Sequence, residues 1–107
     1  MIITTTDNIP GYRVTKVIGL VKGNTVRTRH LGHDIMAQLK NLVGGEVMEY
    51  TKMLAQCREQ SLDRMVDEAR EEGANAVICT RFVTSEILAG ASELLAYGTG
   101  VVVEKEE

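Results

Sequence analysis

Two histidines, His30 and His33, are the only imidazoles in the chain and lie three residues apart. If a short helix opens at Leu31, this spacing places both rings on one side of it. A zinc or copper site needs further ligands, and Asp34 or the same residues of a neighbouring subunit would supply them. The simpler alternative is a solvated pair at a helix start. A transition-metal site at His30 and His33 therefore stands as a hypothesis.

The two cysteines, Cys57 and Cys79, are predicted to be small core residues. Cys57 falls within the apolar stripe of a long predicted helix, and Cys79 lies in the middle of a predicted strand. They form no CxxC motif of a redox or zinc site. The alternatives are a thiolate pair that binds a soft metal where the helix crosses the sheet, or a nucleophile, which would need a base nearby.

The glycines are more typical of structure than of ligand binding. Gly44 and Gly45 precede the long helix, but no phosphate-binding motif is present and Glu46 would repel an anion there. We therefore interpret them as the residues that end the short helix and separate it from the long helix. The glycines of "YGTG" at 97–100 favour close packing, within the chain or against another chain, over ligand contact.

Charged residues are assigned structural roles. Arg81 lies in an otherwise apolar strand row, so it needs a partner, and a salt bridge to Glu86 or Glu93 of a neighbouring strand or subunit is expected. The charged end of the long helix, at 68–72, is interpreted as a solvated face.

The composition predicts one globular domain spanning residues 1–107. The chain is 44% hydrophobic and 25% charged, with a net charge of -3 and no large basic cluster, which argues against nucleic-acid binding. No apolar run approaches the roughly 20 residues that span a bilayer. The first residues lack the features of a signal peptide, so we expect a cytoplasmic protein with reduced thiols.

Hydrophobic periodicity and turn residues predict an α+β fold of two layers, with a mostly antiparallel sheet, one long helix and one short helix. Gly23-Asn24 is interpreted as a bend or bulge. The expected elements are strands at 1–6, 12–27, 75–87 and 94–103, a short helix within 30–45, a long helix at 46–73 and a connection at 88–93.

The strands are apolar on both sides, although one long helix covers only one face of a sheet. In the last strand Leu95, Tyr97, Val101 and Val103 point one way, while Leu94, Ala96, Val102 and two glycines point the other way. In the strand at 12–27 one predicted row contains Tyr12, Val14, Ile18 and Leu20. Since soluble monomers seldom expose large apolar patches, we expect copies of the protein to cover the second face of one another in a homo-oligomer.

The segments "LVGGEVMEYTKML", "GANAVICTRF" and "YGTGVVV", in this order and spacing, resemble the YbjQ-like family. These small, mostly bacterial proteins carry the label "putative heavy-metal-binding". The resemblance covers nearly the whole chain and implies a dodecin-like α/β subunit in a ring of five. The family more often has other residues at the positions of His30 and His33, so the label is not carried onto them.

Together these observations predict a non-enzymatic, homo-oligomeric protein, a pentameric ring by the resemblance, that is either a module binding a metal or a small ligand or a scaffold. The alternative is a small enzyme whose active site lies at the subunit interface and draws residues from two chains.

Overall fold

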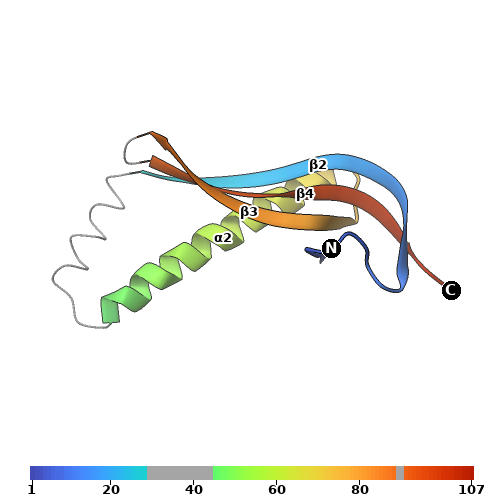
Figure 1. Cartoon of the computed structure of the whole chain (residues 1–107), viewed down its shortest axis with the longest axis horizontal. Coiled ribbons are helices and arrows are strands. Elements are labelled where there is room, and N and C mark those ends of the chain that lie inside the picture. The colour runs from blue at the N-terminus through green and yellow to red at the C-terminus, as the bar shows by residue number, and fades with distance from the viewer. Residues whose placement is uncertain (29–44, 89–90) are drawn as a thin grey trace.

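The computed structural model describes residues 1–28, 45–88 and 91–107, and within them it shows a four-stranded sheet with one long helix (Figure 1). The strand order is β1-β3-β4-β2. β1 runs parallel to β3, and the other pairs are antiparallel, which confirms the α+β prediction. The predicted short helix lies outside the described residues. The elements are β1 (Ile2–Ile3), β2 (Tyr12–Thr28), α2 (Gly45–Glu71), β3 (Ala76–Leu88) and β4 (Ala91–Lys105).

Two β-bulges change which side chains of β2 share a face. The register against β4 shifts between Val14 and Lys16 and again between Val17 and Gly19. Each extra residue moves the following side chains to the opposite face. As a result Val17 and Leu20 lie on one face, and the predicted row that joined Ile18 to Leu20 was wrong. The expected bulge at Gly23-Asn24 is also absent from this register, which runs without a shift from Gly19 to Thr28.

Helix α2 packs mainly on β2, less on β4 and least on β3. Its buried residues recur every four positions, at Cys57, Ser61, Met65 and Ala69, as the predicted stripe required. The stripe does not extend to Leu54, which is 40% exposed. Against α2 the sheet supplies a core that contains Val21, Val77 and Ala96.

A glycine C-cap ends α2. Gly73 has φ +92°, its N–H donates to the carbonyl of Arg70 at 3.0 Å, and the N–H of Ala74 donates to the carbonyl of Ala69 at 2.9 Å. This pair of bonds is a Schellman motif, in which only glycine adopts the left-handed conformation at little cost. The predicted stop at Gly73 is therefore confirmed.

The sheet face opposite α2, which we call the outer face, is covered only in part by the described residues. Near the chain ends a second core of Ala76, Val101 and Val103 packs against Ile2 and Ile9 of the N-terminal segment. Farther along β2, Val17 is 64% exposed and Leu20 is 66% exposed. On the same face lie the exposed Val83 and the half-buried Leu95 and Tyr97. Apolar side chains on this face are therefore exposed, as expected for a sheet with one covering helix.

Strand β4 is longer than predicted. It begins at Ala91, so Ser92 and Glu93 belong to the strand and the expected connection at 88–93 was too long. Within the described residues no helix is both long and apolar enough to cross a membrane.

Candidate functional site

The proposed metal ligands fall outside what the structure describes. His30 and His33 both lie in 29–44, so the metal hypothesis stays a prediction. Across 1–28, 45–88 and 91–107, no group of three or more His, Cys, Asp or Glu side chains is close enough to hold a metal ion. The described side chains therefore do not by themselves form a complete ligand set.

Cys57 is a core residue, as predicted. It is 2% exposed, and its backbone carbonyl accepts a hydrogen bond from Oγ1 of Thr25 at 3.3 Å. The same threonine hydroxyl lies 2.8 Å from the hydroxyl of Ser61, which donates to the carbonyl of Leu94 at 3.0 Å. This buried polar chain ties α2 to β2 and β4, and it provides both buried hydroxyls with hydrogen-bond partners.

Cys79 was predicted to be a core residue in the middle of a regular strand, but it lies in a β-bulge and is only half-buried. Ile78 pairs with Thr99 and Arg81 pairs with Tyr97, so an extra residue of β3 forms a bulge between them. Within this bulge Cys79 has φ +55°, a left-handed conformation that is uncommon for a side chain with a Cβ. It is half-buried, and no disulfide joins it to Cys57.

The N-terminal segment holds this bulge in place. The N–H groups of Cys79 and Thr80 donate to the carbonyls of Thr6 and Thr4 at 2.9 and 3.0 Å. The guanidinium of Arg81 donates to the carbonyl of Thr5 at 2.9 Å and to that of Thr80. The expected salt bridge of Arg81 to Glu86 or Glu93 is not formed within the chain, where backbone carbonyls partner this charge, and a bridge to a neighbouring subunit stays a prediction. Within the bulge, Oγ1 of Thr80 is buried with no partner among the described residues.

Gly98 lies beside the bulge. A Cβ on Gly98 would lie 2.7 Å from Cγ1 of Val77 and 2.9 Å from the carbonyl oxygen of Ile78. Such contacts leave no room for a side chain, so the glycine permits β4 to pass close to β3. The prediction that the "YGTG" glycines serve packing is confirmed at this position.

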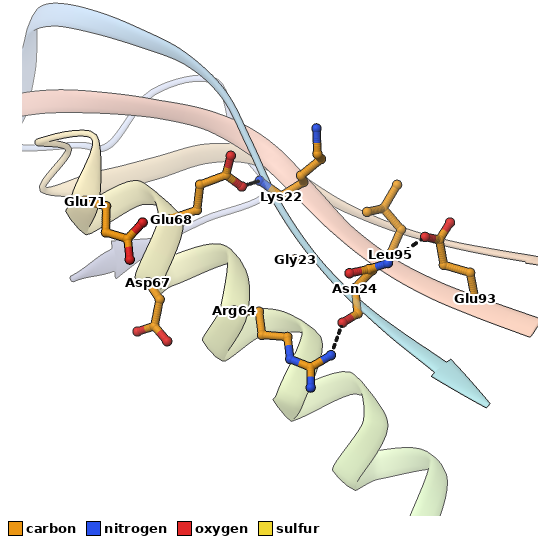
Figure 2. Close-up of a pocket in the computed structure, with 9 residues that line it drawn as sticks. All are labelled: Lys22, Gly23, Asn24, Arg64, Asp67, Glu68, Glu71, Glu93 and Leu95. Atoms are coloured by element: carbon orange, nitrogen blue, oxygen red, sulfur yellow. Dashed lines mark hydrogen bonds between the residues drawn. The ribbon is translucent and has the colours of Figure 1, made fainter.

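A groove of about 520 Å³ runs along the edge of β2 beside α2 (Figure 2). Its two walls are joined by hydrogen bonds: the N–H of Lys22 donates to Oε2 of Glu68 at 2.8 Å, and a guanidinium nitrogen of Arg64 donates to the carbonyl of Asn24. Nδ2 of Asn24 also donates to Oε2 of Glu93 at 2.8 Å. The lining residues are Lys22, Gly23, Asn24, Arg64, Asp67, Glu68, Glu71, Glu93 and Leu95.

The groove is acidic, with four carboxylates against one lysine and one arginine. It contains no cysteine, serine or histidine, so its lining offers neither a usual nucleophile nor an imidazole base. Sequence reasoning assigned Glu68 to a solvated face, but Glu68 contacts the backbone of β2. The available signal was the spacing of Arg64 and Glu68, which places both side chains on one face of the helix.

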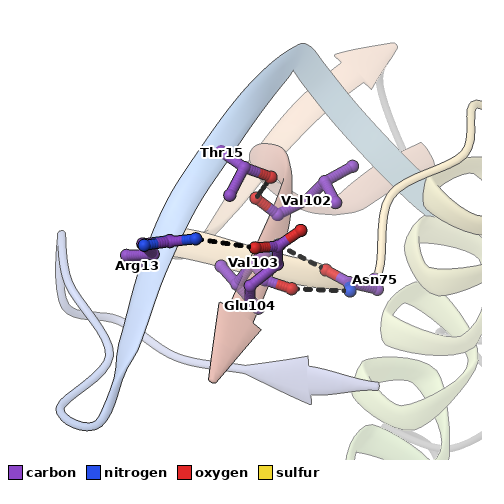
Figure 3. Close-up of polar contacts among 6 residues, drawn as sticks. All are labelled: Arg13, Thr15, Asn75, Val102, Val103 and Glu104. Atoms are coloured by element: carbon purple, nitrogen blue, oxygen red, sulfur yellow. Dashed lines mark hydrogen bonds and ion pairs between the residues drawn. The ribbon is translucent and has the colours of Figure 1, made fainter. Parts of the chain in front are cut away.

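Polar contacts also fasten the C-terminal half of β4 (Figure 3). Oδ1 of Asn75 accepts from the N–H of Val103 at 2.8 Å, while Nδ2 donates to the carbonyl of the same residue at 3.0 Å. Arg13 and Glu104 form an exposed ion pair at 3.0 Å. These contacts are structural, since they join β4 to its neighbours and enclose no cavity.

Comparison with known proteins places the whole chain in one family. A family model described as "Putative heavy-metal-binding" matches residues 1–104. The chain belongs to the YbjQ-like family. This confirms the resemblance carried by the glycine-containing segments, including the stretch around the Cys79 bulge.

Members of the YbjQ-like family with similar sequences occur in bacteria and archaea. The UPF0145 protein of Dehalococcoides mccartyi strain BAV1 is 54% identical over 104 residues, which cover 97% of this chain and 100% of that protein. The UPF0145 protein of Thermococcus kodakarensis is 52% identical over 107 residues, which cover 100% and 95%.

A solved structure shares the fold. A Pediococcus pentosaceus protein, described as having unknown function and belonging to the DUF74 family, matches with a TM-score of 0.55 at 17% identity. The match covers 99% of this chain and 98% of that one. At this identity the similarity extends to the fold alone.

Proposed function

We propose that this chain is a subunit of a closed homo-oligomer that acts as a binding module for a transition metal or a small ligand, without catalysis. The observation that carries the proposal is the outer face, where Val17 and Leu20 are about two-thirds exposed beside Val83, Leu95 and Tyr97. Removing apolar surface from water is worth roughly 25 cal/mol per Å². A second copy that covers this face would gain that free energy.

A second copy is the favoured partner because the two most exposed apolar side chains of the outer face, Val17 and Leu20, are aliphatic. They resemble the face of a domain core, and obligate homo-oligomer interfaces have this composition, while the polar Lys22 and Asn24 lie farther along the same face. Closed symmetry is usual for soluble homo-oligomers, and the family resemblance supports a ring of five. The family description supports a metal as the ligand.

Native mass spectrometry on freshly purified protein tests the assembly and the ligand together. We expect a closed multiple of the subunit mass, five by the resemblance, with bound zinc or copper or a small molecule. A Val17→Lys/Leu20→Lys variant should dissociate into subunits, whereas Leu54→Lys, a charge placed on an exposed apolar residue of α2, should not. Wild-type protein that sediments as a stable single subunit would contradict the assembly.

The metal is tested separately at the two histidines. If they bind it, His30→Ala/His33→Ala protein should lose stoichiometric metal while keeping its subunit number. Metal retained by this variant would show that other residues bind it. An organic ligand would instead appear as an added mass that chelators do not remove.

A further inference from the structure

Strand β2 forms one edge of the sheet for its whole length. Its neighbour is β4 on one side, and in the described sheet no strand lies on the other side. An edge strand presents alternate N–H and C=O groups to solvent, which another strand can pair with. Lys22 and Asn24 are two residues apart on β2, so their backbone groups point to the same side.

Two side chains of α2 occupy these edge groups. Glu68 accepts from the N–H of Lys22, and Arg64 donates to the carbonyl of Asn24 (Figure 2). A strand that added to this edge would need the same N–H and the same C=O. It would therefore have to displace two hydrogen bonds made by charged groups, which are stronger than bonds between neutral groups.

Gly23 brings the helix close enough for these contacts. A Cβ at this position would lie 2.3 Å from the backbone N of Met65 and 2.3 Å from the carbonyl oxygen of Ser61. The helix thus rests directly on the strand at Gly23, and Arg64 and Glu68, one turn apart, reach the residues on either side of it.

Arg64 and Glu68 do not pair with one another, although their spacing is that of a helical ion pair. No ion pair joins Arg64 to Glu68, both of which lie in the described part of α2. Both charges of the α2 pair are directed to the backbone of β2 instead, which is the expected arrangement if covering the edge is their role.

We propose that Arg64 and Glu68 close the edge of β2 to incoming strands and thereby prevent open-ended, edge-to-edge association of copies of this chain. The acidic groove adds to the effect, since Asp67, Glu71 and Glu93 lie beside the same edge. This role is independent of the proposed ligand and of the outer face, because it restricts association along a different surface.

The test compares two charge-neutral double variants of the full chain. Arg64→Ala/Glu68→Ala removes both edge contacts, while Asp63→Ala/Arg70→Ala removes one acid and one base from the same helix outside the groove. Sedimentation velocity over a hundredfold concentration range should show species that grow with concentration for the first variant only. The same distribution for both variants, with unchanged far-UV circular dichroism, would overturn the proposal.

Hydrogen exchange gives a second measurement that does not require the double variant to fold. In wild-type protein the amide of Lys22 should be protected. Glu68→Gln, which keeps an acceptor, should retain most of that protection, and Glu68→Ala should accelerate exchange at Lys22 at least tenfold with little change at Val21. Equal protection in Glu68→Ala and wild type would also overturn the proposal, because the edge would then be covered by something else.

Discussion

Replacing Gly23 with alanine is the sharpest perturbation of this fold, because the atoms in the way belong to the backbone. The added Cβ would lie 2.3 Å from two backbone atoms of α2 and 2.7 Å from the carbonyl carbon of Arg64. No rotamer change relieves such contacts. Restoring an ordinary separation of 3.4 Å requires the helix and the strand to move apart by about 1 Å.

That displacement opens the best-packed part of the molecule. Val21, Met65, Ala69 and Ala96 are fully buried at this contact. A gap of up to about 1 Å loses a quarter to a half of the dispersion attraction of the atoms that line it. Overpacking of this kind costs about 1–3 kcal/mol, and we expect Gly23→Ala at the upper end because the clash is with rigid backbone. In a domain of this size that corresponds to a fall in Tm of about 10 °C or more.

Differential scanning calorimetry and urea denaturation would measure this loss at matched protein concentration. Gly11→Ala is a suitable control, since a Cβ there meets nothing within 4 Å and the only cost is its left-handed φ of +84°. It should lower the stability by about 1–2 kcal/mol. If Gly23→Ala unfolds within 2 °C of wild type, roughly within the error of such a scan, α2 does not rest on β2 as described.

Substitutions in three polar contacts give further tests. Ser61→Ala should lower the free energy of unfolding by about 0.5–1.5 kcal/mol, because the hydrogen bond to the carbonyl of Leu94 and the contact with the hydroxyl of Thr25 are lost; urea denaturation would measure it. Asn75→Ala should cost about 1–2 kcal/mol, and Asn75→Asp should not restore it, since the carboxylate cannot donate to the carbonyl of Val103. Arg13→Ala and Glu104→Ala should each change stability by less than about 1 kcal/mol, since their side chains are 65% and 58% exposed, and a larger loss would show that the pair is buried in an assembly.

The helix was predictable because its signal is periodic and uninterrupted. Buried residues recur every four positions from Cys57 to Ala69, and Gly73 marks the end of α2 in the sequence as in the structure. The faces of β4 were predictable for the same reason, since its side chains alternate without a bulge of their own. Local pattern and tertiary packing agree in these two elements.

The faces of β2 were not predictable, because a bulge adds a residue without changing the composition. Nothing in "RVTKVIGL" distinguishes a regular strand from one with two register shifts, apart from Gly19, whose φ is +126°. Alternation applied across these shifts assigns Leu20 to the wrong row.

The partners of Arg64, Glu68 and Arg81 could not be predicted from the sequence either, because each of these side chains bonds to a backbone group that is distant along the chain. Arg81 bonds to a carbonyl 76 residues away, and Glu68 to an amide 46 residues away. Arg81 was expected to pair with a carboxylate, but within the chain this exposed arginine bonds to backbone carbonyls beside a bulge. The general requirement for a partner was correct, and its identity depended on the fold.

The position of α2 makes the two edges of the sheet different. Because the helix rests on Gly23, it covers β2 closely and leaves β3 from Arg81 to Ile87 exposed, including Phe82 on the helix side and Val83 on the outer face. The β2 edge is occupied by charged side chains, whereas the far end of β3 carries exposed apolar ones. If copies of the chain associate as proposed, the charged side chains at the β2 edge would restrict pairing along that edge, separately from any contact through the outer face. The contact between Gly23 and α2 therefore affects both the packing of the core and the position of the charged side chains at the β2 edge.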